Sequence, residues 1–217
     1  MKVNMSQLYT DFLDNRRKQV LNQLKSFSNI VTLGGGTALC MQINHRRSYD
    51  FDLLVSTPIE KSLLNRVIKI FSENIEILVD TGDELSVLIS REVKVTFIYF
   101  PFPHLYTPIK TLSIPVLDWK DIASDKAYAI GRRGEYRDYV DIFTIIRKGF
   151  DLDNIIGDAE KKFKGVFSSK LFLGQLVYFD DLGDFTVDFI GRKYSLEEIK
   201  RYLKRTVSEY INKKEVL

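Results

Sequence analysis

The sequence predicts an α/β protein in which helices flank a mixed sheet and an α-rich part follows. Two observations predict this class. Up to Pro103 the apolar residues alternate between strand-like and helix-like spacing, and from Leu117 onward the spacing is helical. The 217 residues are 45% hydrophobic and 28% charged, which is the range of globular proteins. We therefore expect a core at 1–116 and an α-helical C-terminal region at 117–217 that closes a cleft.

Composition excludes several classes of protein. Cys40 is the only cysteine, so a disulfide framework is impossible and a cysteine-based zinc site is disfavoured. The net charge of +3 permits a nucleic-acid partner without arguing for one. The apolar stretch at 95–102 is far shorter than the ~20 residues that span a bilayer, and charges among residues 1–24 do not fit a signal peptide. We expect a cytoplasmic protein without a membrane partner.

The first elements follow from changes in spacing. Apolar residues at helical spacing predict an N-terminal helix over 5–24. A short apolar run at 30–33 is closed by three glycines at 34–36, which predicts a strand that turns into a helix over 37–43. The next strand is expected at 48–55.

The later elements complete the sheet and begin the helical region. Pro58 is placed like the first-turn proline of a helix that runs to Phe71. Strands are expected at 76–79, 85–90 and 93–100.

Three further helices are expected near the C-terminal end. They cover 121–133 and 137–148, and the last begins at Ser195. Ser195 followed by Glu198 is the pattern of a capping box.

Asp50 and Asp52 are the sharpest chemical signal. Residues two apart in a strand point to the same side, so the two carboxylates stand side by side. Like charges at that spacing repel, and a divalent cation between them removes the cost. The alternative is a solvated strand end.

The glycines at 34–36 strengthen the metal interpretation. A strand, a glycine turn that opens a helix, and Asp-x-Asp on the next strand occur in the order that nucleotidyltransferase folds use. Glycines let backbone N–H groups approach phosphate oxygens at a helix N-terminus, and carboxylates hold the Mg²⁺ that bridges those phosphates. Taken alone, the triple glycine would be a strand-to-helix turn.

Several motifs in order resemble one family. They are Gly-Gly-Thr-Ala-Leu at 35–39, His-Arg-Arg-Ser-Tyr-Asp-Phe-Asp-Leu at 45–53, Lys-x-x-Ala from Lys126, and Arg-Asp-x-x-Asp at 137–141. Over residues 30–146 the chain resembles the AbiEii/AbiGii toxin family of nucleotidyltransferases.

The resemblance implies a nucleotidyltransferase core with NTP as substrate and Mg²⁺, or Mn²⁺, as cofactor. For some members it implies a toxin role in a type IV toxin–antitoxin pair, with RNA, including tRNA, as a target and a cognate antitoxin as a partner. The site residues that it implies fall into three groups. Asp50 and Asp52 hold the metal; Gly35, Gly36, Thr37, Ser48 and Lys126 bind NTP; Asp50, Asp52, Lys126, Asp138 and Asp141 are catalytic.

Thr96 departs from the wider superfamily, which expects a third carboxylate in the middle of a later strand. A threonine hydroxyl cannot act as a general base near pH 7 as an aspartate can. We expect Mg²⁺-dependent transfer of NMP from an NTP to an acceptor hydroxyl. The alternative is a catalytically weak or inactive relative that binds NTP, RNA or an antitoxin.

Lys126 supplies an independent argument, because it shares a helical stripe with Ile122 and Ala129. A lysine on an inner face needs an anion, either a nucleotide phosphate or a carboxylate of Asp138 or Asp141. The final helix also gathers cations, which either contact nucleic-acid phosphates or form a solvated basic face. They are Lys200, Arg201, Lys204, Arg205, Lys213 and Lys214.

Overall fold

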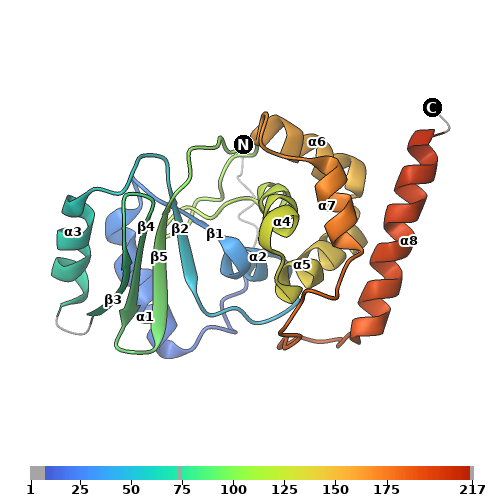
Figure 1. The fold of residues 1–217 in the computed structure, drawn as a ribbon. Helices are drawn as coiled ribbons and strands as arrows, with labels where there is room; N and C mark the ends of the chain where they lie inside the picture. Colours follow the sequence, from blue (N-terminus) through green and yellow to red (C-terminus); the bar gives the residue numbers. More distant parts are fainter. Residues whose placement is uncertain (1–7, 73–74, 216–217) are drawn as a thin grey trace, which may run out of the picture. The chain divides into compact units, whose positions relative to one another are not determined.

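The computed structural model describes residues 8–72 and 75–215. Within them the chain forms two compact units, one that ends at Trp119 and one that begins at Lys120. The first unit contains a mixed five-stranded sheet in the order β1-β2-β5-β4-β3, and the second is helical (Figure 1). This is the mixed α/β class that the sequence predicts. Among the described helices, none combines the length and the apolar character needed to cross a bilayer.

The sheet places strands that are far apart in the sequence next to each other. Strand β2 runs parallel to β5, while the pairs β1–β2, β5–β4 and β4–β3 are antiparallel. The strands are β1 Thr32–Gly34, β2 Phe51–Val55, β3 Ile75–Asp80, β4 Glu84–Ile89 and β5 Val93–Tyr99. Strands β2 and β5 are therefore parallel neighbours inside the sheet, and both contribute residues to the candidate site described below.

One face of the sheet forms the core of the first unit. Phe51 and Leu53 of β2 and Val95 and Phe97 of β5 have no exposed surface. The ring of Phe27, which follows the first helix, lies 5.2 Å from that of Phe97. Burial of each such side chain stabilises the fold by about 1.5–3 kcal/mol. Because strand residues alternate, the polar residues between them point to the opposite face.

Three helices and a 3₁₀ turn accompany this sheet. They are α1 Asn15–Gln23, η1 Leu24–Phe27, α2 Gly35–Ile43 and α3 Lys61–Phe71. The predicted start of the first helix at residue 5 is wrong within the described part: residues 8–14 precede the helix, and Asp14 caps it by accepting a hydrogen bond from the Arg17 N–H at 2.8 Å. Residues 5–7 lie outside the described residues.

Two other predicted boundaries are also corrected. Pro58 lies outside α3, because Glu60 is its N-cap residue. The strand predicted at 48–55 begins at Phe51, since side chains rather than a strand partner hold residues 48–50, as the site geometry shows.

The second unit is built from five helices within the described residues. They are α4 Trp119–Arg133, α5 Tyr136–Arg147, α6 Leu152–Lys162, α7 Ser169–Leu176 and α8 Leu196–Glu215. Helices α6 and α7 are not among the elements predicted from the sequence, although Asp151 and Ser168 are side-chain N-caps of the kind that marks a helix start. The capping box of α8 is confirmed, because Ser195 and Glu198 exchange both hydrogen bonds, at 2.8 and 3.2 Å.

A buried charge cluster joins α4 to α6. Lys162 Nζ lies 2.9 Å from Asp121 Oδ1 and 2.6 Å from Asp125 Oδ1. The side chains of Lys162 and Asp121 have no exposed surface, and that of Asp125 is 20% exposed. Burial raises the pKa of Asp125 to about 6; Lys162 opposes that rise, while the charge of Asp121 adds to it. The one ammonium group of Lys162 therefore lies between two carboxylates, and Asp125 is the one whose pKa is raised.

We predict that Asp125 makes stability fall as pH rises from about 4 to about 6. In that window the folded state holds a proton that the unfolded state, with an ordinary aspartate pKa of 3.8, has lost. At about 1.4 kcal/mol per pKa unit the total is on the order of 1–3 kcal/mol. In urea unfolding from pH 4 to 7, the free energy of unfolding of the native protein should fall relative to that of Asp125→Asn as the pH rises. A difference that stays constant or grows with pH would contradict the prediction.

Candidate functional site

The N-terminus of α2 is pressed against the carboxylate of Asp52. Gly34, the last residue of β1, pairs with Asp52 in β2, and the chain then turns into α2 at Gly35. Gly35 has a φ of +64°, and a Cβ on it would lie 2.2 Å from Asp52 Oδ2. Glycine is therefore required twice here, for its backbone conformation and for the close approach.

Gly36 makes a second close approach. A Cβ on Gly36 would lie 2.6 Å from Arg46 Nη2 and 3.0 Å from Ser48 Oγ. The guanidinium of Arg46 is almost fully buried and donates a hydrogen bond to the carbonyl oxygen of Arg47 at 3.1 Å. The first N–H groups of a helix lack partners within the helix and favour anions. A helix start, a cation and a hydroxyl thus meet beside the acid, which is an arrangement suited to a phosphate group.

Thr37 connects α2 to the segment that precedes β2. Its buried hydroxyl donates to the backbone carbonyl oxygen of Asp50 and lies 3.1 Å from Ser48 Oγ. Because the hydroxyl has one proton, Ser48 donates to Thr37. Thr37 therefore acts through its side chain to fix the position of Asp50, while its backbone belongs to the helix start.

Arg17 of α1 also holds the segment that precedes β2. Its Nε donates to the carbonyl oxygen of Tyr49 at 3.2 Å, and its Nη2 donates to that of Glu92 at 3.1 Å. The guanidinium also lies 4.8 Å from the centre of the Tyr49 ring. Sequence reasoning missed this positioning role, because Arg17 looks like any exposed cation of an amphipathic helix and its partners are 32 and 75 residues away.

The two acids offer oxygen ligands at the edge of this turn. Asp52 is partly buried in β2, and Asp50 is exposed immediately before the strand. In the described parts of the chain, no three or more Asp, Glu, His or Cys side chains gather into a complete metal cage. Mg²⁺ is usually bound by one or two carboxylates together with water and substrate phosphates. The carboxylate of Asp52 lies beside the helix start, and Asp50, whose backbone Thr37 holds, comes two residues earlier; oxygen ligands of this kind fit such a site.

Thr96 occupies the place that the sequence pattern assigns to a third carboxylate. The β2–β5 register pairs Asp52 with Thr96, so both side chains lie on the face opposite the core. Thr96 is buried, and Ser86 on β4 is its partner on the other side. The expected strand register is therefore present, and the residue at this position is neutral.

Lys126, Asp138 and Asp141 meet in the second unit. Lys126 Nζ lies 2.5 Å from Asp138 Oδ1 and 3.1 Å from Asp141 Oδ2. The side chain of Lys126 is 13% exposed, and that of Asp141 is fully buried. Asp138 Oδ2 also accepts from the N–H of Glu135 at 3.3 Å, as part of a capping box at the start of α5. The carboxylates thus orient the lysine, and one of them also caps its own helix.

The basic residues of α8 are partly neutralised. Lys213 and Lys214 each lie 2.8 Å from an oxygen of Asp153 on α6. Arg205 lies 3.5 Å from Glu209 and Lys200 lies 3.7 Å from Glu197. This favours the interpretation of α8 as a solvated, ion-paired face.

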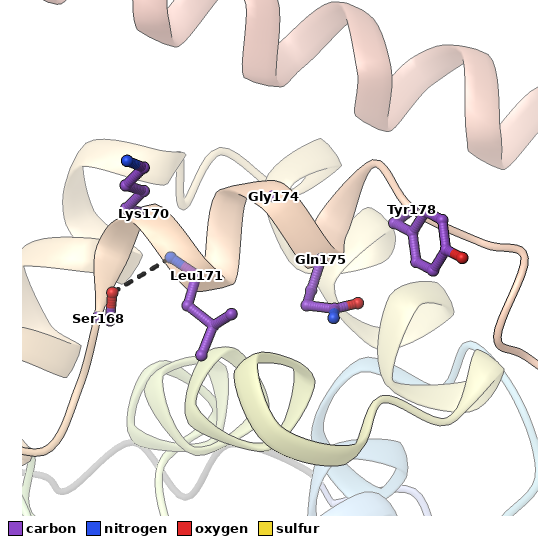
Figure 2. A pocket seen from close by; sticks show the side chains of 6 residues that line it. All are labelled: Ser168, Lys170, Leu171, Gly174, Gln175 and Tyr178. Atoms are coloured by element: carbon purple, nitrogen blue, oxygen red, sulfur yellow. Dashed lines mark hydrogen bonds between the residues drawn. The ribbon is translucent and has the colours of Figure 1, made fainter.

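A hollow of about 460 Å³ lies along α7. Figure 2 shows its lining, with the side chain of Leu171 directed toward α4, where Gly131 lies close to it. The lining residues are Ser168, Lys170, Leu171, Gly174, Gln175 and Tyr178. None of them is a carboxylate, so the lining offers no charged oxygen ligand for Mg²⁺.

Known proteins resemble both the sequence and the fold. The sequence model of a family described as nucleotidyl transferase AbiEii toxin, type IV TA system, matches residues 19–181. The uncharacterised protein aq_aa25 of Aquifex aeolicus (strain VF5) is 32% identical over 208 residues, and the match covers 90% of this chain and 98% of that protein.

Solved structures share the fold at low identity. MenT4, a nucleotidyltransferase toxin (Rv2826c) from Mycobacterium tuberculosis H37Rv, has a TM-score of 0.60 at 12% identity, with 89% of this chain and 80% of that chain covered. JHP933 from Helicobacter pylori has a TM-score of 0.52 at 15% identity, with 94% and 97% covered.

We predict that Gly35→Ala destabilises the protein by at least about 2 kcal/mol. A left-handed backbone alone costs a non-glycine residue about 1–2 kcal/mol, and the methyl group would also displace the carboxylate of Asp52. Gly82→Ala is the matched control, because a Cβ there would meet nothing within 4 Å. Urea unfolding of the two variants measures the difference. Equal free energies of unfolding in the two variants would show that a methyl group fits at position 35, contrary to the structure.

Proposed function

The chain belongs to the AbiEii family of nucleotidyltransferase toxins, and we propose that it transfers NMP from an NTP to an acceptor hydroxyl with Mg²⁺ as cofactor. The observation that carries the proposal is the contact between the start of α2 and Asp52. A Cβ at Gly35 would lie 2.2 Å from Asp52 Oδ2, and this close approach supports a site shared by the helix start and the acid. Such a site can hold a phosphate through backbone N–H groups and the cation of that phosphate through carboxylates.

In the proposed reaction, the acceptor oxygen attacks the α-phosphorus in line with the leaving group. The new bond joins that oxygen to phosphorus, the proton of the acceptor hydroxyl passes to water, and the bond to the bridging oxygen breaks. Pyrophosphate leaves with the electron pair of that bond. A Mg²⁺ bound at Asp50 and Asp52 would neutralise phosphate charge and polarise the reacting phosphoryl group. The chain contributes position: Thr37 and Arg17 hold the backbone at residues 49–50, and Gly35 and Gly36 let the helix start approach Asp52 and Arg46.

Lys126 is proposed as the cation that neutralises the developing charge on the nucleotide. Asp138 and Asp141 hold its ammonium group within 3.1 Å, which restricts its orientation. The side chain of Lys126 is 13% exposed, whereas that of Lys162, the other lysine between two carboxylates, is fully buried. Asp138 and Asp141 are in this proposal positioning residues for Lys126.

The acceptor and partner are proposed from the family. Its description as the toxin of a type IV toxin–antitoxin system supports an antitoxin protein as the partner. RNA, including tRNA, is our proposed acceptor, and the cytoplasm our proposed location. The rival proposal is a relative that binds NTP or antitoxin without turnover. The neutral Thr96 beside Asp52 favours that rival over full activity.

Labelled NTPs incubated with total tRNA and Mg²⁺ test the reaction. We predict 3′-extended RNA with the native protein, and at least about a 100-fold lower rate when Asp50→Asn and Asp52→Asn remove the metal ligands. Asp80→Asn with Asp83→Asn, two exposed acids of the same unit, is the control and should react like the native protein.

Two results would contradict the proposal. If the Asp50→Asn, Asp52→Asn variant keeps native metal-dependent NTP binding, the site is wrong. If the native protein binds NTP but yields no product with any of the four NTPs, the binding-protein rival is favoured.

Growth arrest on expressing the chain alone, relieved by a neighbouring antitoxin-like gene, tests the toxin role.

We predict that Lys126 acts on NTP affinity separately from stability. Lys126→Ala would remove the ammonium group that lies 3.1 Å from the fully buried carboxylate of Asp141, so it would destabilise the fold as well. The better variant combines Lys126→Gln with Asp141→Asn, which keeps hydrogen-bonding groups and removes both charges. It should weaken NTP binding about tenfold or more, the value of a charge-assisted hydrogen bond, with a melting temperature near that of the native protein.

The control uses the other lysine cluster of the same unit. Lys162→Gln with Asp121→Asn should lower the melting temperature and leave NTP affinity unchanged, since both side chains are fully buried. Calorimetry with a non-hydrolysable NTP measures affinity in both double variants. Unchanged affinity in the Lys126 variant would assign that lysine a purely structural role.

A further inference from the structure

A row of polar residues crosses the sheet at Asp52. Gly34 pairs with Asp52, Asp52 with Thr96, and Thr96 with Ser86, across the neighbouring strands β1, β2, β5 and β4 (Figure 1). Paired residues of a sheet point to the same side, so these lie on the face opposite the core. Glu84 is two residues before Ser86 and shares its face.

Hydrogen bonds connect the far end of this row. Ser86 Oγ lies 2.6 Å from Glu84 Oε1 and 3.0 Å from Thr96 Oγ1. Ser86 and Thr96 are buried, with 1% and 5% of their surface exposed. The row therefore runs from a carboxylate through two hydroxyls to the strand position opposite Asp52.

The proton positions in the row follow from its chemistry. Each hydroxyl has one proton, and a carboxylate accepts without donating. Because a hydrogen bond to a charged acceptor is about twice as strong as a neutral one, the proton of Ser86 goes to Glu84. Thr96 then donates its own proton to Ser86. The remaining lone pairs of Thr96 Oγ1 are left as acceptors.

We propose that Glu84, acting through Ser86, fixes Thr96 as a hydrogen-bond acceptor beside Asp52, where it orients the water of a cation held by Asp50 and Asp52. This rests on the proposed function, because it assumes the metal site. Adjacent strands are about 4.8 Å apart, so Glu84, two strands from Asp52, lies roughly 10 Å away and is too far to ligate that cation itself. Glu84 and Ser86 are positioning residues for Thr96.

The geometry explains how this fold keeps a metal site without a third carboxylate. An aspartate at position 96 would supply both charge and an acceptor oxygen. Here the neutral Thr96 supplies the acceptor, and the charge stands one strand farther, on Glu84. Without Glu84, Ser86 would have no charged acceptor, and the direction of both hydroxyls would be open to reversal.

Glu84→Gln tests the proposal, because an amide can donate to Ser86 and so reverse the row. Mn²⁺ titration followed by electron paramagnetic resonance, with a non-hydrolysable NTP present, should show about tenfold weaker Mn²⁺ binding, the lower end of the loss when an outer hydrogen bond of a metal site is removed. Thr96→Val, which removes the acceptor oxygen, should weaken Mn²⁺ binding similarly. Thr96→Ser, which keeps that oxygen, should bind Mn²⁺ with native affinity. Glu76→Gln, an exposed acid on β3, is the control.

A double variant sharpens the test. Thr96→Asp places a new carboxylate beside Asp52, where it should tighten Mn²⁺ binding, but it would compete with Glu84 for the one proton of Ser86. We therefore expect a larger gain from Thr96→Asp in the Glu84→Gln background than in the native one. Equal gains in both backgrounds would overturn the coupling.

The outcomes separate this inference from the proposed function. Native Mn²⁺ affinity in Glu84→Gln, together with its loss in the Asp50→Asn, Asp52→Asn variant, overturns the role of Glu84 and leaves the metal site standing. Absence of metal-dependent NTP binding in the native protein overturns both. A lower melting temperature of Glu84→Gln with native Mn²⁺ affinity would assign the row to stability and overturn the proposal.

Discussion

The contact between Gly35 and the carboxylate of Asp52 is the constraint on which the first unit depends. Any side chain at position 35 would occupy the place of Asp52 Oδ2, so the helix can start there only on a bare backbone. That start directs unpaired N–H groups to the side of the sheet on which the acid lies. The neighbouring interactions serve the same geometry, because Thr37 and Arg17 hold the two residues just before β2. Backbone, acid and strand therefore form one rigid turn.

The sequence indicated this turn because its signals are local. Three glycines, a helical stretch and Asp-x-Asp lie within 20 residues, and the alternation of β2 and β5 predicts which residues share a face. Arg17, Glu84 and Ser86 carry no such signal, since their roles appear only when distant strands pair. Helices α6 and α7 were missed for another reason: their capping residues are ordinary loop residues until the following turn is known to be helical.

The second unit contains two lysines that each meet two carboxylates, and burial distinguishes their roles. Lys162 and Asp121 are fully buried, so the cluster joins α4 to α6 and has no surface to offer a ligand. Lys126 has the same partners in kind but keeps an exposed fraction of 13%. Removing a buried partner costs stability whatever the function, which is why charge removal must be balanced in pairs. Exposure, rather than charge, therefore distinguishes Lys126 from Lys162, and it is the reason that Lys126 is the lysine assigned to the nucleotide in the proposed function.

Charge elsewhere narrows the places where a polyanion could be held. The last turn of α8 looks basic in sequence, yet Asp153 takes both Lys213 and Lys214. The hollow along α7 has one cation and an otherwise apolar or neutral lining. At the start of α2, by contrast, the buried guanidinium of Arg46 and the helix N-terminus lie against the same glycine. A triphosphate needs donors and a cation at one point, and among these three places the glycine turn combines them with the carboxylate of Asp52, as the proposed function requires.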